Sequence, residues 1–248
     1  MKRIWRLVAL VLLAGLGLQL FFLVRIALAA TVDPQSTTFQ RSEAWRIATG
    51  SKPFRWRQQW VPYERISENL KRAVIASEDD SFSSHEGVDW EALEKAWERN
   101  ARAEARAARQ QARASTRSQL APIKRPKIVG GSTITQQLAK NLLLSGERTL
   151  LRKGQEIVLT FALERMLSKE RILEIYLNSV EWGEGVFGAE AAARHYYRKP
   201  AAQLSAYEAA RLAVMLPRPK YFEKLPNSGY LASRASTIVA RMRDADLP

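Results

Sequence analysis

The chain has 248 residues, 39 Lys and Arg against 25 Asp and Glu, a formal net charge of +14 at pH 7, and no cysteine. The absence of cysteine excludes disulfides, thiol catalysis, thiolate zinc sites and iron–sulfur clusters. With 46% hydrophobic and 26% charged residues, the chain can bury a core, and its length suits one domain plus an attachment. So strong a positive charge suggests an anionic partner: nucleic acid, a membrane surface or a phosphorylated substrate.

The amino-terminal segment, residues 1–30, predicts a short cytoplasmic start and a transmembrane anchor. In residues 7–24 only Gln19 is strongly polar, and as a helix this run nearly spans a hydrocarbon core of about 30 Å. Three basic residues precede it, so the positive-inside rule predicts that the amino terminus is cytoplasmic and the rest lies across the membrane. The alternative is a signal peptide cleaved near residues 27–29. The length of the apolar run and the position of Arg25 favour the anchor.

The remaining chain predicts a mainly α fold. Residues 31–65, with three prolines and several aromatic residues, predict an extended membrane-proximal segment whose rings either lie at the headgroups or pack on the domain. A domain is expected over 66–225, opening near the candidate N-cap Ser67, and a C-terminal helix over 226–248. No convincing alternating strand is found after residue 128. The expected helices there are 133–144, 150–167, 169–177, 184–197, 205–216 and 230–242.

Residues 95–127 have a different composition, rich in Ala, Arg and Gln, with ten basic residues and two acids. The arginines recur every three or four residues, which places them on one face of a helix that offers no apolar stripe to a core. This basic insertion is therefore either solvated or lies along anionic headgroups or glycan-linked phosphate. The solvated form is the favoured expectation.

A first candidate cluster follows an apolar helix at Glu78 and Asp79. Acids at a helix C-terminus face the negative end of the dipole and each other, so at least one should have a raised pKa and act as a stronger general base. His85 and Glu86 begin a His-Glu-x-x-His pattern, but residue 89 is Asp, which excludes the paired zinc ligands of that motif. Taken alone, the cluster also fits a polar turn.

A second cluster, residues 130–141, reads Gly-Gly-Ser-Thr-Ile-Thr-Gln-Gln-Leu-Ala-Lys-Asn. Thr133 and Gln136 fit a capping box that opens a helix. Free amides at such an N-terminus attract phosphate, and Gln136 and Lys140 project from one face. A plain glycine turn with a helix cap explains the same residues.

A third cluster places Arg148, Arg152, Lys153 and Glu156 three or four residues apart. This spacing fits simple surface ion pairs. It also fits a cationic patch for a phosphate leaving group with a second carboxylate beside it, provided that the three clusters converge.

Together these segments resemble the motifs of the peptidoglycan glycosyltransferases, family 51. Residues 78–87, 130–141 and 152–156 resemble the first three motifs, 169–178 the fourth, and 183–197 the fifth. Five motifs in family order make the resemblance specific. The chain contains no Ser-x-x-Lys, the nucleophile motif of the transpeptidase domain in larger members, so it resembles the monofunctional enzymes. The basic insertion departs from the family by its length and charge.

The resemblance implies a lysozyme-like helical domain that polymerises lipid II. The growing glycan would pass from undecaprenyl pyrophosphate to the 4-hydroxyl of the acceptor, with inversion to a β-1,4 linkage, with no transpeptidase activity and with inhibition by moenomycin. The alternatives are a lytic transglycosylase that cuts the same glycan and an inactive cell-wall scaffold. The implied partners are lipid II, undecaprenyl pyrophosphate-linked glycan, the membrane and divisome or elongation proteins, without nucleic acid. The implied location is the bacterial inner membrane, with a periplasmic catalytic domain.

The resemblance also implies the residue roles. Glu78 is the expected general base and Glu156 the second essential carboxylate. The expected substrate and pyrophosphate-binding residues are Ser132, Thr133, Gln136, Gln137, Lys140, Asn141, Arg148, Arg152 and Lys153. The expected supporting residues are Asp79, Phe82, His85, Gly87, Lys169, Glu174, Tyr176 and Asn178. No metal-ligand set and no required cofactor are expected, although some relatives respond to a divalent cation, Mg²⁺ or Mn²⁺.

Overall fold

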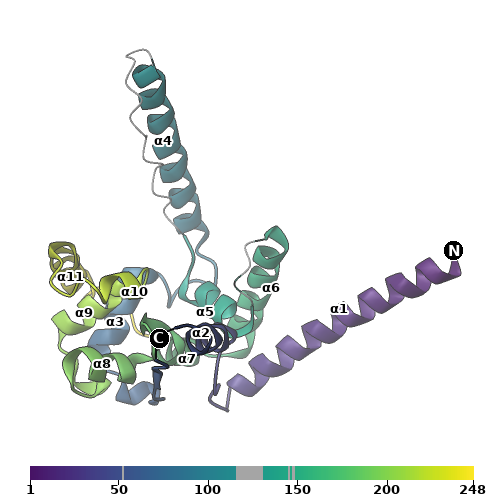
Figure 1. The fold of residues 1–248 in the computed structure, drawn as a ribbon, viewed down its shortest axis with the longest axis horizontal. Coiled ribbons are helices and arrows are strands. Elements are labelled where there is room, and N and C mark those ends of the chain that lie inside the picture. The colour runs from purple at the N-terminus through teal and green to yellow at the C-terminus, as the bar shows by residue number, and fades with distance from the viewer. Residues whose placement is uncertain (52, 116–130, 145, 147–148) are drawn as a thin grey trace.

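The computed structural model describes residues 1–51, 53–115, 131–144, 146 and 149–248, with the backbone alone for 110–115. It is mainly helical (Figure 1). The α-helices are α1 (Lys2–Ala29), α2 (Thr38–Ala48), α3 (Glu68–Glu78), α4 (Trp90–Ser115), α5 (Ile134–Leu143), α6 (Leu150–Met166), α7 (Lys169–Ser179), α8 (Ala189–Tyr197), α9 (Ala206–Met215), α10 (Pro219–Phe222) and α11 (Gly229–Arg241). The short 3₁₀ helices are η1 (Tyr63–Arg65) and η2 (Ala201–Gln203), and the strands are β1 (Arg57–Gln58), β2 (Glu181–Gly183) and β3 (Val186–Phe187).

Serine and threonine caps explain where several helices begin. The side chains of Ser67 and Thr133 accept hydrogen bonds from backbone N–H groups three residues on, at the starts of α3 and α5. The same arrangement opens α6, α7 and α9. A cap satisfies an N–H group that has no partner inside the helix. The predicted cap at Ser67 and the predicted capping box at Thr133 are confirmed, as are the helices that follow them.

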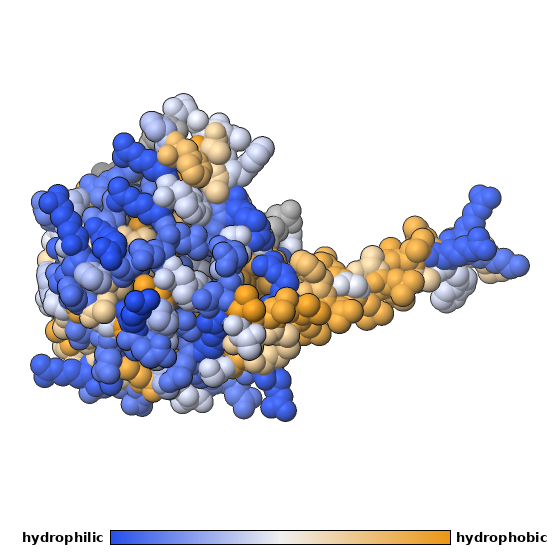
Figure 2. All heavy atoms as spheres, turned by 90° about the horizontal axis from the view of Figure 1, so that it is seen from below, coloured by the Kyte–Doolittle hydropathy of each residue, from blue (hydrophilic) through white to orange (hydrophobic). Residues whose placement is uncertain are grey.

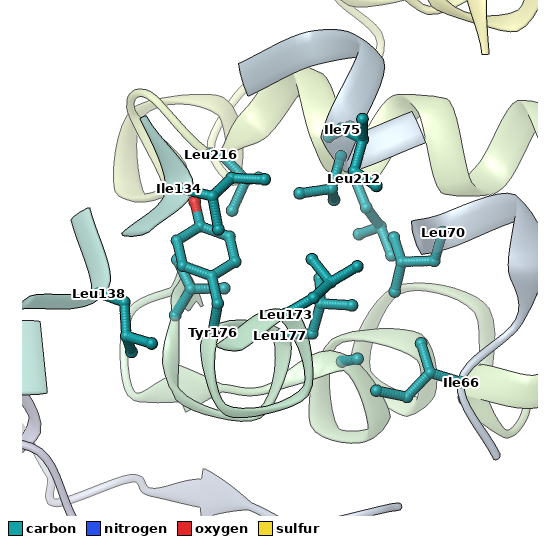
Figure 3. Packing of buried hydrophobic residues seen from close by; sticks show 14 of the residues in the cluster. Ile66, Leu70, Ile75, Ile134, Leu138, Leu173, Tyr176, Leu177, Leu212 and Leu216 are labelled. Carbon is teal, nitrogen blue, oxygen red and sulfur yellow. The ribbon is translucent and has the colours of Figure 1, made fainter. Parts of the chain in front are cut away.

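Helix α7 forms the centre of the core. Its residues 172–173 and 175–179 are all buried, as expected for a helix enclosed on every side. Figure 3 shows Tyr176 of α7 among side chains of α5 and of the α9 end, while α3 contributes Leu70 and Ile75 nearby. Because α3, α5 and α7 share this apolar cluster, the ends of α3 and α5 are held in fixed positions relative to each other.

A small three-stranded sheet lies in a region where the sequence predicted none. Strand β3 pairs in parallel with β1 and antiparallel with β2. The helix expected from residue 184 begins only at 189, because Gly185 and Gly188 adopt positive φ angles of 70° and 85°. A Cβ on Gly188 would lie 2.7 Å from the Asn178 carbonyl oxygen. Strands of two or three residues are too short to show an alternating pattern.

The membrane-proximal segment 31–65 differs from the extended form expected for it, since it contains α2. Thr37 and Gln40 form a capping box at the start of this helix, and Gln40 Nε2 donates to the Ser179 carbonyl oxygen at 3.3 Å. Trp56 stacks on Phe187 with ring centroids 4.5 Å apart, so this ring packs on the domain. Helix α2 forms because its polar cap and its contact with the body outweigh the extended preference of the flanking prolines.

Helix α1 leaves the body as a long apolar arm with a basic tip (Figures 1 and 2). Its most apolar 18-residue window has a mean hydropathy of 2.7, and 6% of that window is buried. Phe22 and Ile26 pack against the body, and Gln19 and Gln155 of α6 exchange two hydrogen bonds of 2.8 and 2.9 Å. By length and composition this helix can cross a membrane.

Helix α4 is a second arm, directed away from the body and crosswise to α1 (Figure 1). Ala96 is buried near its base, where Gly131 approaches the α4 backbone closely. Trp90 and Trp97 are 63% and 75% exposed. The helical expectation for the basic insertion is confirmed as far as Ser115, and residues 116–127 of the insertion lie outside the described residues.

Candidate active site

Glu78 is the last residue of α3, where the apolar helix ends at the edge of the core. Its Oε2 accepts a hydrogen bond from Gln137 Nε2 at 3.1 Å. Burial raises the pKa of Glu78, the negative charge of Asp79 raises it further, and the Gln137 bond opposes the shift. The predicted raised pKa at this helix end is thus confirmed, with burial as its largest cause. A carboxylate with a raised pKa is a stronger proton acceptor near neutral pH.

Gln137 is held by both ends of its amide. Tyr176 donates its hydroxyl proton to Gln137 Oε1 at 3.1 Å, while Gln137 Nε2 donates to Glu78. Burial, together with the charge of Glu78, raises the pKa of Tyr176 well above its usual value, so this tyrosine remains a donor. The chain of bonds therefore fixes the orientation of the amide and of the Glu78 carboxylate.

Asp79 ties the loop after α3 to the start of α5. Its two oxygens accept from His85 Nε2 and from the Ile134 backbone N–H, each at 2.8 Å. His85 Nδ1 accepts from the Gly87 N–H at 3.0 Å, so the proton of His85 lies on Nε2. Asp79 and His85 therefore organise the loop, and Asp79 also lines a pocket together with Glu78.

At the N-terminus of α5, where the sequence predicts phosphate binding, side chains of the protein accept hydrogen bonds from the N–H groups of Thr133, Ile134 and Gln136. Thr133 and Gln136 complete the capping box with each other, and Thr133 also donates to the Gly87 carbonyl oxygen at 2.6 Å. The anion at this helix N-terminus is the Asp79 carboxylate, which fits the helix dipole. Thr133 and Gln136 thus hold the turn, and Ser132 is exposed at the rim of a pocket that Glu78 also lines.

The side chains of α6 form the cationic part of the site. Glu156 is buried and accepts from Arg152 Nη1 at 2.9 Å and from Lys153 Nζ at 2.5 Å. Arg152 Nε is buried without a hydrogen-bond partner among the described residues. One carboxylate thus holds two cations, and one of them, Arg152, lines a cleft together with Lys140. Arg148, the fourth member of this predicted cluster, lies outside the described residues.

One hollow lies along α5, and a second lies at the turn that precedes this helix. The larger, of about 540 Å³, is lined by Gln137, Lys140, Asn141 and Arg152 among others. The smaller, of about 170 Å³, is lined by Glu78 and Ser132. The Glu78–Gln137 bond joins the two. The structure therefore brings residues of the three sequence clusters together at adjoining cavities.

The remaining predicted residues hold the loops and helices around the site in position. Lys169 Nζ donates to the His85 carbonyl oxygen at 2.6 Å and lies 4.6 Å from the centre of the buried Phe82 ring. Asn178 bonds both the N–H and the C=O of Val61 at 2.9 Å. Glu174 accepts from Trp60 Nε1 at 3.3 Å. Gly87 has a φ of 86°, and a Cβ there would lie 2.7 Å from Thr160 Cγ2, so only glycine fits this turn.

The structure adds residues that the sequence motifs did not indicate. Arg99 of α4 and Arg241 of α11 line the smaller pocket with Glu78, and Glu181 of β2 lines the larger cleft. The sequence offers one feature that could have singled out Glu181, since it is an acidic residue within an apolar stretch of the chain. Within the described part of the chain, no three histidine, aspartate or glutamate side chains gather as a metal site.

Comparisons with known proteins show the family to which the chain is similar. A family model described as "Transglycosylase" matches residues 47–243. A protein of Burkholderia orbicola (strain MC0-3), named biosynthetic peptidoglycan transglycosylase, is 51% identical over 235 residues, which cover 95% of this chain and 87% of the relative. A protein of the same name from Burkholderia thailandensis is 51% identical over 236 residues, which cover 95% of this chain and 84% of the relative.

Proposed function

This chain belongs to the transglycosylase family and is a peptidoglycan transglycosylase, and we propose that it polymerises lipid II into glycan strands. The observation that carries the proposal is the bond between Glu78 and Gln137. Gln137 lines the larger cleft together with Arg152. The bond therefore connects this cleft to a carboxylate of raised pKa. A proton acceptor and cations for a leaving group thus line two pockets that the Glu78–Gln137 bond links.

Glu78 acts as the general base. It takes the proton from the 4-hydroxyl of the acceptor while that oxygen attacks the anomeric carbon of the donor glycan. The bond from that carbon to undecaprenyl pyrophosphate breaks, and the α linkage becomes β-1,4. General-base assistance of this kind contributes about 10²- to 10⁴-fold to a rate.

The cations of the cleft stabilise the departing pyrophosphate. Arg152 and Lys153 are held by Glu156, and Lys140 lines the same cleft as Arg152. Positive charge fixed before the reaction stabilises the charge that develops on the leaving group, without reorganisation during the step. Ser132 and Asn141 supply hydrogen bonds to the bound substrate from the walls of the two hollows.

Helix α1 holds the enzyme on the membrane that carries its substrate. Both donor and acceptor are tethered by lipid, so a transmembrane helix that confines the enzyme to that surface raises their effective concentration. The basic residues at its start favour, by the positive-inside rule, an amino terminus in the cytoplasm and a catalytic domain in the periplasm.

The test is incubation of the full-length protein, in liposomes, with labelled lipid II. We expect glycan polymer with β-1,4 linkages, blocked by moenomycin, and no cleavage of finished cell wall. Release of soluble fragments from cell wall without polymer formation would instead indicate the lytic enzyme. Neither activity, with retained binding to glycan, would indicate the scaffold.

A further inference from the structure

Glu181 is a buried acid in the larger cleft. It follows α7 at the start of β2, is 7% exposed, and lines the cleft together with Gln137 and Arg152. Its Oε1 lies 3.2 Å from Lys220 Nζ, within ion-pair range but without hydrogen-bond geometry, so this oxygen has no hydrogen-bond donor in the described part of the chain. A buried acceptor without a donor carries a free-energy cost that a ligand can relieve.

Lys220 does not neutralise Glu181 alone. The same ammonium contacts Glu43 of α2 and lies 4.0 Å from Glu184. Arg46 also pairs with Glu43 and Glu184, at 2.8 and 2.6 Å. Two cations are thus shared by three carboxylates. Burial raises the pKa of Glu181 to about 7, with the negative charges of Glu43 and Glu184 adding to the shift and Lys220 opposing it.

These surroundings restrict what Glu181 can bind. A carboxylate beside two others repels phosphate, so Glu181 does not belong to the pyrophosphate-binding set. Lys220 lies between the carboxylates, where its charge disfavours a metal ion. The group that best satisfies Oε1 is an uncharged hydrogen-bond donor. Glycans present many such donors, as ring hydroxyls and acetamido N–H groups.

We propose that the Glu181 carboxyl group accepts a hydrogen bond from a sugar hydroxyl or acetamido N–H of the glycan in the cleft, and so positions that glycan relative to Glu78. The proposal rests on the proposed function, since the glycan is that of lipid II. Gln137 provides the geometric link, because it lines the same cleft as Glu181 and bonds Glu78. Glu181 is therefore a positioning residue for sugar and takes no part in proton transfer.

The test compares lipid II turnover by Glu181→Leu, Glu181→Gln and wild-type protein. Loss of a neutral hydrogen bond predicts that Glu181→Leu raises KM by roughly threefold to tenfold with little change in kcat. Glu181→Gln keeps an acceptor oxygen and should restore KM to within about twofold of wild type. If Glu181→Leu does not fold, Glu181→Ala carries the same prediction. Because the bond is to sugar, the KM difference must persist with lipid II whose peptide stem is shortened.

The matched control is Glu43→Gln. Glu43 contacts Lys220 as Glu181 does but does not line the cleft, so its KM should stay at the wild-type value. A rise in KM in Glu43→Gln equal to that in Glu181→Leu would show that Glu181 only supports Lys220 and would overturn the proposal. An unchanged KM in Glu181→Leu and Glu181→Ala would overturn it as well. Wild-type protein that forms no polymer would instead refute the proposed function itself.

Discussion

Glu78 and Glu156 are two acids of the same site in opposite surroundings. Glu78 receives one neutral hydrogen bond from Gln137 and lies beside another acid, Asp79. Glu156 is buried between two cations, Arg152 and Lys153. A carboxylate without a cation holds a proton readily, whereas one paired with cations fixes their position. The two acids are of the same residue type, so their different surroundings are the basis for proposing proton transfer at Glu78 and charge stabilisation around Glu156.

The largest effect is expected at Glu78. Glu78→Gln keeps the shape of the side chain but removes the base, so lipid II turnover should fall about 10²- to 10⁴-fold. Glu86→Gln, an exposed acid in the following loop, is the matched control and should retain wild-type turnover. Near-normal polymerisation by Glu78→Gln would show that Glu78 is not the base.

The second largest loss of turnover is expected on replacing a cation that Glu156 holds. Arg152→Ala removes one of the two cations held by Glu156, so kcat should fall by roughly 10²-fold, the usual cost of one preorganised charge-stabilising donor. Arg165→Ala, an exposed arginine in the last turn of the same helix, should leave kcat unchanged. If both variants lost activity equally, general charge and not position would be responsible.

The raised pKa of Glu78 predicts a smaller, pH-dependent effect on stability. Unfolded Glu78 ionises at its ordinary pKa of 4.5, whereas the folded protein keeps its proton to higher pH. Stability should therefore fall as the pH rises from the unfolded to the folded pKa. Glu78→Gln lacks this loss, so it should melt above wild type at pH 7 and match it near pH 4. The kcat/KM of wild type should rise with pH through the same raised pKa. A Glu78→Gln melting advantage that persists unchanged at pH 4 would contradict this linkage.

The smallest effect is expected far from both acids, on α4. Arg106 and Arg109 are exposed, so replacing both with Gln should change turnover by no more than about twofold, as for exposed charges generally. The solvated reading of the basic insertion also predicts unchanged binding to anionic vesicles. Flotation assays with neutral and anionic lipid test this, since a selective loss on anionic lipid would indicate the headgroup-binding alternative.

Local sequence patterns predicted much of the helical framework. The capping box of Thr133 and Gln136 and the cap at Ser67 can be recognised from neighbouring residues, because a cap bonds groups only three positions apart. The helices after residue 133 follow from apolar periodicity in the same way. The hairpin of β2 and β3 was missed because its strands are very short, and α2 because prolines flank it.

The positions of the Asp79 and Glu181 carboxylates could be known only from the tertiary structure. Free amides at the start of α5 predicted a bound phosphate, but Asp79, 55 residues earlier in the chain, occupies the Ile134 N–H. Glu181 was not predicted, because its neighbours Glu43 and Lys220 come from α2 and α10. Such interactions depend on distances across the fold, which no local pattern contains.

The sequence by itself determined the apolar amino-terminal helix, the mainly helical class and the family resemblance, since periodicity and motif spacing are local properties of the chain. The tertiary structure alone decided which acid is desolvated, which is paired with cations and which lines the cleft. The physical reason is that burial and charge pairing arise only when α3, α5, α6 and α7 contribute to one core, and these two effects set the proton affinity of a carboxylate.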